Sequence, residues 1–194
     1  MDKLAAADLM PLEQYARERP AFRARVLRHK GARQLTVGPN TTWCFEDRLT
    51  VQYQVQEMLG TERIFEPQGI AAELGAYNPL IPDGSNWKVT LLIEFAQPEE
   101  RARALARLKG IEDGCWVQVA GQARVFAIAD EDLERENEEK TSAVHFLRFE
   151  LTAGMIASLR LGAPLAVGVD HEHYRYVVHE VPAAIRLALV ADFA

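Results

Sequence analysis

Hydrophobic residues recur at helical spacing through the first third of the chain. Residues 11–18 predict one short helix, and a proline is expected to open a second over about residues 20–32, because proline fits the first turn of a helix without losing a hydrogen bond. The apolar side chains of residues 46–59 predict a third helix, with Gly60 placed as its C-terminal cap. A fourth, short helix is expected over residues 70–76.

Short apolar runs rich in β-branched residues alternate with helical patterns in the rest of the chain. Strands are expected over four segments, residues 87–95, 115–129, 143–151 and 164–171. The second of these could also be a hairpin broken at Gly121. Three helical patterns accompany them, over residues 98–109, 152–161 and 182–193. Residues 35–45 hold two β-prone pieces around a Gly-Pro-Asn turn, which predicts a small hairpin.

The order of these elements indicates an α+β fold. Between residues 87 and 171 it is β-α-β(β)-β-α-β, which is compatible with a ferredoxin-like arrangement of helices on one face of an antiparallel sheet. We expect one domain over residues 1–194. Its mainly helical part, residues 1–80, would pack against an antiparallel sheet with helices in residues 87–194, including a C-terminal helix.

Composition places the chain among ordinary globular proteins. It has 194 residues, of which 48% are apolar and 26% charged, as expected for one folded domain. Its two cysteines form no CxxC pair, which is typical of reduced thiols in a cytosolic protein. The start of the chain lacks a signal-peptide core and no apolar run is long enough to span a membrane. We therefore expect a soluble, cytoplasmic protein.

Charge is unevenly distributed along the chain. Residues 17–33 are rich in arginine and lysine, whereas residues 130–140 are rich in acids, although the net charge is −6. Such segregation can steer a partner or close one part of the protein on another. It can equally reflect two solvated surfaces of different sign. The acidic total and the lack of a recognised motif make nucleic-acid binding unlikely.

The helix predicted over residues 46–59 carries the first group of candidate site residues. Arg48, Gln52 and Gln56 continue one stripe along it, and Glu57 lies beside them. Amides on a half-buried stripe need hydrogen-bond partners, which could be one another, a loop or a ligand. The alternative is an ordinary polar helix face with a solvated carboxylate.

Ionisable residues on apolar strands form the second group. Glu94 lies in the strand predicted at 87–95, and His145 and Arg148 lie in that at 143–151. These strands are otherwise apolar on both faces, so we expect them to be buried on both, and each ionised side chain must then be paired. A structural pair of Glu94 with Arg148 is one outcome, and a catalytic or binding site shared with the helix of residues 46–59 is the other.

The segment DHEHY offers a candidate metal site. His171 and His173 would project to the same side of an extended backbone, where two imidazoles can hold a metal ion. Histidines near a strand end are also commonly just solvated. The sequence lacks GxGxxG, GxxxxGK[ST], HExxH and GxSxG motifs and zinc-type cysteine spacing. The identity of any cofactor therefore stays open.

Several distinctive strings occur in an order that resembles a known bacterial family. They are RPAFRARVLRHKGAR, FEDRLTVQYQVQEML, ELGAYNPLIPDGSNWKVTLLIEF, SAVHFLRFEL and PLAVGVDHEHY. The sequence is similar to the uncharacterised family called domain of unknown function 3501. Genes of that family are often found beside those for rubrerythrin-like di-iron proteins and iron–sulfur oxidoreductases. The resemblance therefore implies a part in peroxide or redox stress, and it brings no catalytic residues with it.

Two classes of function follow from these observations. The first is an accessory or partner-binding protein of a bacterial redox or peroxide-stress system, with a rubrerythrin-like or iron–sulfur protein as its partner. The second is a small metal-binding protein or enzyme, with a polar site between the helix of residues 46–59 and the central strands. Either could act as a homo-oligomer.

Overall fold

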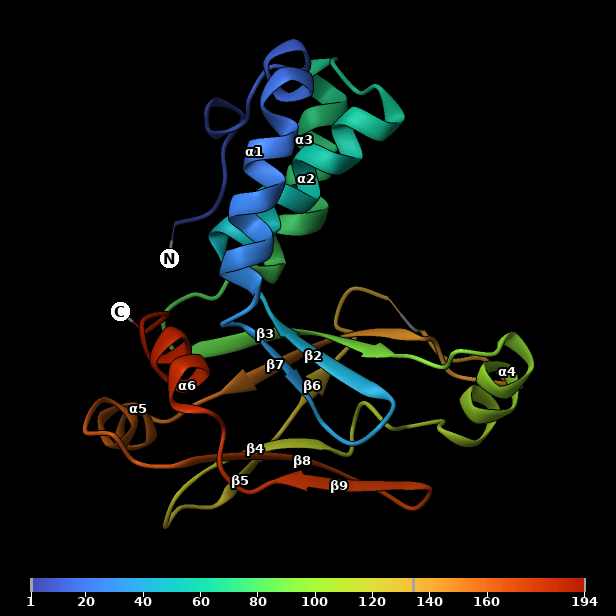
Figure 1. The fold of residues 1–194 in the computed structure, drawn as a ribbon, viewed down its shortest axis with the longest axis vertical. Helices are drawn as coiled ribbons and strands as arrows, with labels where there is room; N and C mark the ends of the chain where they lie inside the picture. Colours follow the sequence, from blue (N-terminus) through green and yellow to red (C-terminus); the bar gives the residue numbers. More distant parts are fainter. Residues whose placement is uncertain (1, 134, 194) are drawn as a thin grey trace.

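Two stacked antiparallel sheets and a bundle of helices make up the computed structural model, which describes residues 2–133 and 135–193 (Figure 1). The first sheet has the order β1-β2-β3-β7-β6 and comprises Gln34–Thr36, Thr41–Phe45, Asn86–Ile93, Val144–Glu150 and Ile128–Ala129. The second has the order β5-β4-β8-β9 and comprises Arg124–Phe126, Cys115–Val119, Leu165–His171 and Tyr174–Val178. The α+β class is thus confirmed.

Three helices rise from the outer face of the first sheet (Figure 1). They are α1 (Leu12–Lys30), α2 (Arg48–Glu62) and α3 (Pro67–Tyr77), flanked by the short 3₁₀ helices η1 (Ala6–Asp8) and η2 (Asn78–Leu80). At one end of the stacked sheets lies α4 (Pro98–Arg107), and at the other lie α5 (Ala153–Arg160) and α6 (Ala183–Val190). Among the described residues, no helix is long and apolar enough to cross a membrane.

The main core lies between the two sheets. Along β3 and β7 buried and half-buried residues alternate, as expected where one face of a sheet is packed and the other is wetter. Trp43 stacks on Phe149 with ring centroids 5.6 Å apart, and Trp87 donates a hydrogen bond to the carbonyl of Leu189 in α6 at 3.0 Å. The expectation that these strands are buried on both faces is therefore wrong.

The strands do not form the single sheet of a ferredoxin-like fold. The chain changes sheets immediately after β5, because β5 pairs with β4 while β6, two residues later, pairs with β7. A backbone hydrogen bond from Ala127 to Cys115 at 2.9 Å fixes that crossing. The segment of residues 115–129 is accordingly a hairpin of β4 and β5 in the second sheet, followed by β6 in the first. Strand β9 was not indicated by the hydrophobic pattern.

The helical part differs from expectation at two points. The two helices predicted around Pro20 are one continuous helix, α1, in which Pro20 is exposed. Proline removes one hydrogen bond in mid-helix, but water can reach the freed carbonyl there, and Tyr15, Phe22 and Val26 keep the helix packed. Likewise α2 does not end at Gly60, since its C-terminal cap is Arg63 in the left-handed conformation, with φ of 56°.

Candidate functional site

The polar stripe of α2 holds the N-terminal segment of the chain. Gln56 is fully buried; its Oε1 accepts from the backbone N–H of Met10 at 2.6 Å and its Nε2 donates to the carbonyl of Met10 at 3.3 Å. Gln52 donates to the carbonyl of Asp8 at 2.6 Å, and Arg48 pairs with the Asp8 carboxylate at 2.8 Å. The amides thus have a loop as their partner, and not a ligand.

Glu57 lies on a different side of α2, against α1. Its carboxylate accepts two hydrogen bonds from Arg19, each of 2.7 Å, and one from the hydroxyl of Tyr15. The hydrogen bond from Arg19 is the largest cause that lowers the pKa of Glu57, to about 2. This residue therefore serves as an anchor between two helices.

The three ionisable strand residues do not meet one another. Glu94 is exposed and accepts a hydrogen bond from the hydroxyl of Thr42 at 2.7 Å. Arg148 forms ion pairs with Glu131 and Glu150, so the expected pair of Glu94 with Arg148 is wrong. His145 lies on the inner face of β7 and Arg148 on its outer face, because residues three apart on a strand point to opposite sides. The predicted convergence of these residues on one cleft does not occur.

His171 is the last residue of β8, and His173 lies in the turn that leads to β9. His171 Nε2 donates to the carbonyl of Lys109 at 2.9 Å, and its Nδ1 accepts from the backbone N–H of His173 at 3.2 Å. Both ring nitrogens of His171 thus have backbone partners. A metal ion on these two histidines, which stays a prediction, would have to displace one of those hydrogen bonds.

A pocket of about 320 Å³ lies where α2 and α3 meet the outer face of the first sheet. Its apolar walls include Met58, Tyr77, Leu80 and Phe146. Its charged lining residues are Glu73, Lys88, Glu131, Asp132, Arg135 and Arg148. Apolar walls with a few polar groups are typical of small-molecule sites, and the volume is at the lower end of their range.

Lys88 is the unusual residue of this pocket. It lies half-buried on β3, and its ammonium makes no hydrogen bond or ion pair with any described residue. Burial lowers its pKa, and the nearby Arg148 lowers it further. The other two cations of the pocket are balanced, Arg148 by Glu131 and Arg135 by Asp132 at 2.5 Å. Lys88 is therefore the cation with spare bonding capacity.

A second pocket of about 340 Å³ adjoins the first and shares Tyr77, Leu80 and Phe146 with it. Glu46 lies on its wall and accepts hydrogen bonds from the hydroxyls of Thr50 at 2.5 Å and Thr90 at 2.7 Å. This carboxylate is thus satisfied within the fold. We refer to these two adjoining pockets together as the junction groove, which lies at the base of the helix bundle.

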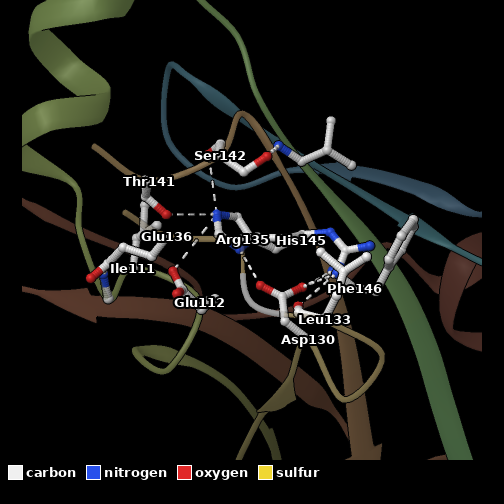
Figure 2. Close-up of polar contacts among 12 residues, drawn as sticks. Ile111, Glu112, Asp130, Leu133, Arg135, Glu136, Thr141, Ser142, His145 and Phe146 are labelled. Atoms are coloured by element: carbon white, nitrogen blue, oxygen red, sulfur yellow. Dashed lines mark hydrogen bonds and ion pairs between the residues drawn. The ribbon is translucent and has the colours of Figure 1, made fainter. Parts of the chain in front are cut away.

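His145 is the centre of a separate buried cluster, which Figure 2 shows. Its Nδ1 lies 2.6 Å from Asp130 Oδ2, and its Nε2 lies 3.1 Å from both the Thr141 hydroxyl and the Ser142 carbonyl. Asp130 itself is fixed by the backbone N–H of Phe146 at 2.9 Å. The acidic segment of residues 130–140, which we call the acidic loop, is therefore tied to β7 at its first residue.

Glu112 completes this cluster from the turn before β4. Its Oε2 lies 3.7 Å from His145 Nε2, is inaccessible to solvent and has no hydrogen-bond partner among the described residues. Burial raises the pKa of its carboxyl group. Glu112, Asp130 and His145 can each bring one ligand atom within 4.8 Å of the others, so the cluster could hold a metal ion.

The sequence contained a signal for Lys88 but none for the partners of His145. Lys88 shares one face of its strand with Thr90, Leu92 and Glu94, and a lysine within an apolar run is a sign of an unusual environment. Glu112 and Asp130 lie in turns far from His145 in sequence. Only the folded chain brings them together.

Comparisons with known proteins agree with the architecture. The model of the family described as "Protein of unknown function (DUF3501)" matches residues 3–193. A crystal structure of a novel protein of unknown function from Burkholderia pseudomallei K96243 is 48% identical, covers 100% of both chains and superposes with a TM-score of 0.95. No curated protein matches the chain. The matched family model spans nearly the whole sequence, and the chain therefore belongs to the DUF3501 family.

Proposed function

We propose that the junction groove binds a small organic acid, with Lys88 as the counter-ion of its carboxylate. The observation that carries this proposal is the half-buried ammonium of Lys88, which makes no hydrogen bond or ion pair with any described residue while it lines a pocket with apolar walls. A partly desolvated cation gains more from an arriving anion than a solvated one does. The apolar walls suit an aromatic or aliphatic body next to that carboxylate.

The cross-strand neighbour of Lys88 supports an anionic ligand further. In the register of β3 with β7, Lys88 lies opposite Arg148, and like charges placed directly opposite destabilise a sheet. An incoming carboxylate between them would relieve that repulsion. Glu73, on the facing wall of the pocket, also makes no hydrogen bond or ion pair with any described residue. Because its negative charge would repel a carboxylate, the site would accept only ligands that keep their anionic end near the sheet.

A calorimetric titration with 2-naphthoate and its neutral amide, 2-naphthamide, tests the proposal. We expect naphthoate to bind at one site and at least tenfold more tightly than the amide. Lys88→Met should reduce naphthoate binding at least tenfold. The exposed Lys140 provides the matched control, since Lys140→Met should leave binding unchanged.

Three results would contradict the organic-acid proposal. They are no saturable binding of naphthoate at millimolar concentration, equal affinity for the acid and the amide, and unaltered binding by Lys88→Met. Glu73→Gln adds a check on orientation, because removing that negative charge should strengthen naphthoate binding or leave it unchanged. A large loss on this substitution would instead indicate a role for Glu73 in holding the ligand.

A partnership with a rubrerythrin-like or iron–sulfur protein is a second proposal. It rests on the family resemblance and on α1, where Arg17 and Arg28 on the outward face and Arg23 on its flank are exposed without a hydrogen bond or ion pair to any described residue. Such a face suits an acidic partner. Affinity capture at low salt should recover a redox protein with the native chain and lose it with Arg17→Glu/Arg23→Glu. Failure to recover one would count against the partnership, and the organic-acid proposal would stand independently.

A further inference from the structure

We propose that Glu112 and His145 bind a divalent transition-metal ion of the zinc class, with Asp130 holding the imidazole in position. His145 points to the inner side of β7, whereas the junction groove lies on the outer side of that sheet. None of the three residues lines the groove, so the inference does not depend on the organic-acid site. Figure 2 shows their side chains pointing toward one another from three elements of the fold.

The spacing of the ligand atoms fits such an ion. Bonds of 2.0–2.2 Å to nitrogen and oxygen place two ligands of a tetrahedral zinc ion about 3.4 Å apart. His145 Nε2 and Glu112 Oε2 are 3.7 Å apart, close to that value. An ion between them would therefore need only a small shift of either side chain.

Oxygen atoms that could complete the coordination lie on the same side of the ring. The Thr141 hydroxyl and the Ser142 carbonyl are both 3.1 Å from His145 Nε2. Mixed nitrogen and oxygen donors suit zinc and neighbouring divalent ions better than they suit magnesium, which prefers oxygen and retains its water. The donor set thus selects the class of ion.

Asp130 occupies the position of an orienting carboxylate. It faces Nδ1 of His145 at 2.6 Å, on the opposite side of the ring from Glu112. Metal-binding histidines commonly donate their second ring N–H to a carboxylate, which fixes the tautomer and the ring plane. Asp130 is in turn held by Phe146 N–H and lies 3.4 Å from Arg135, so the ring is rigidly placed.

The unsatisfied carboxylate oxygen of Glu112 favours a bound metal ion over a cluster that is complete without one. Its Oε2 is inaccessible to solvent, yet no described residue donates a hydrogen bond to it. Buried carboxylate oxygens normally have a donor, because leaving one unsatisfied is costly. A metal ion at this oxygen would supply the missing interaction.

Titration of the metal-stripped full-length chain with Zn²⁺, and with Mg²⁺ for comparison, tests the inference. We expect one Zn²⁺ per chain, bound at least 100-fold more tightly than Mg²⁺, and visible absorption bands when Co²⁺ replaces zinc. Glu112→Gln should weaken Zn²⁺ binding at least tenfold, and Asp113→Asn on the exposed neighbouring residue should not. Asp130→Asn should weaken affinity 10- to 100-fold without changing the stoichiometry, as expected for a positioning residue.

Either of two results would overturn the metal site. One is an absence of saturable Zn²⁺ binding, and the other is binding that Glu112→Gln leaves unchanged. His173→Gln separates this site from the turn between β8 and β9: if that substitution abolishes binding while Glu112→Gln does not, the ion belongs to His171 and His173. Circular dichroism of each variant shows whether a loss of Zn²⁺ binding comes from unfolding. If Glu112→Gln unfolds, Glu112→Asp replaces it, because aspartate keeps the charge and withdraws the oxygen from the site.

Discussion

Lys88 and Arg148 lie directly opposite each other on β3 and β7, on the face of the sheet that the helix bundle covers. Two cations in this relation repel each other. Ion pairs with Glu131 and Glu150 balance Arg148, but Lys88 gains no hydrogen bond or ion pair from the described residues. The position is therefore costly for stability, as positions that serve binding often are.

Replacing Lys88 by methionine is expected to stabilise the protein. The substitution keeps the length of the side chain and removes a partly desolvated charge beside Arg148, so the free energy of unfolding should rise by about 0.5–1 kcal/mol. Urea denaturation measures the change, and Lys140→Met should leave the stability within about 0.5 kcal/mol of the original. A loss of more than about 1 kcal/mol in Lys88→Met would show that the fold uses the ammonium structurally.

Gln56 is expected to be the residue of the α2 stripe that matters most for stability. Gln56→Ala leaves the backbone N–H and carbonyl of Met10 without their partner, which should cost about 2–3 kcal/mol. Hydrogen exchange should become faster at the amide of Met10. Gln54 is exposed and has no hydrogen bond to any described residue, so Gln54→Ala should change neither quantity appreciably. Equal effects of the two substitutions would contradict this assignment.

The helical spacing of α2 was predictable from the sequence, but the role of its polar residues was not. Three to four residues per turn placed Arg48, Gln52 and Gln56 on one stripe. Which segment would lie against that stripe depended on the path of the first eleven residues, which have no strong local pattern. A ligand and a loop satisfy an amide equally well, so local chemistry could not separate them.

The division of the strands between two sheets was also beyond the sequence. Short apolar runs rich in β-branched residues indicated most of the strands, although not β9. Pairing depends on where the chain leaves the second sheet for the first, between Phe126 and Ile128, and no local pattern marks that point. The pairing of β6 with β7 brings Asp130 beside His145. The sequence around either residue alone therefore could not predict the cluster.

Glu57 is expected to make stability depend on pH in the acid range. Its pKa in the folded protein is about 2, below the ordinary value of 4.5, so its contribution is complete above pH 4.5 and is lost as the pH falls toward 2. A shift of this size corresponds to about 3 kcal/mol at most. Solvent around Arg19, whose side chain is 50% exposed, reduces the expected value to about 1–2 kcal/mol.

The direction of this pH dependence can be checked by measuring the unfolding free energies of the original chain and of Glu57→Gln from pH 7 to pH 2.5. The difference between them should be largest near neutral pH and should shrink on acidification. Glu139→Gln, at an exposed residue of the acidic loop, should show no difference at neutral pH. A difference for Glu57→Gln that grows as the pH falls would contradict the assignment.

Gly38 is expected to tolerate no side chain. Its φ is 74°, and a Cβ there would lie 2.5 Å from the Tyr174 hydroxyl and 2.6 Å from the Tyr176 ring. Gly38→Ala should therefore cost about 3 kcal/mol or more from strain and overpacking together. Gly121 has a φ of 77° and open space around it, so Gly121→Ala isolates the backbone contribution of about 1–2 kcal/mol. Equal losses of stability for Gly38→Ala and Gly121→Ala in thermal denaturation would rule out the contribution from packing around Gly38.

The most direct test of the organic-acid site is nuclear magnetic resonance of the lysine side-chain ammonium groups, followed as a function of pH with and without 2-naphthoate. We expect the pKa of Lys88 to lie below its ordinary value in the free protein, because burial and Arg148 lower it, and to rise when naphthoate binds. A Lys88 resonance that titrates at the ordinary value and does not respond to naphthoate would contradict it.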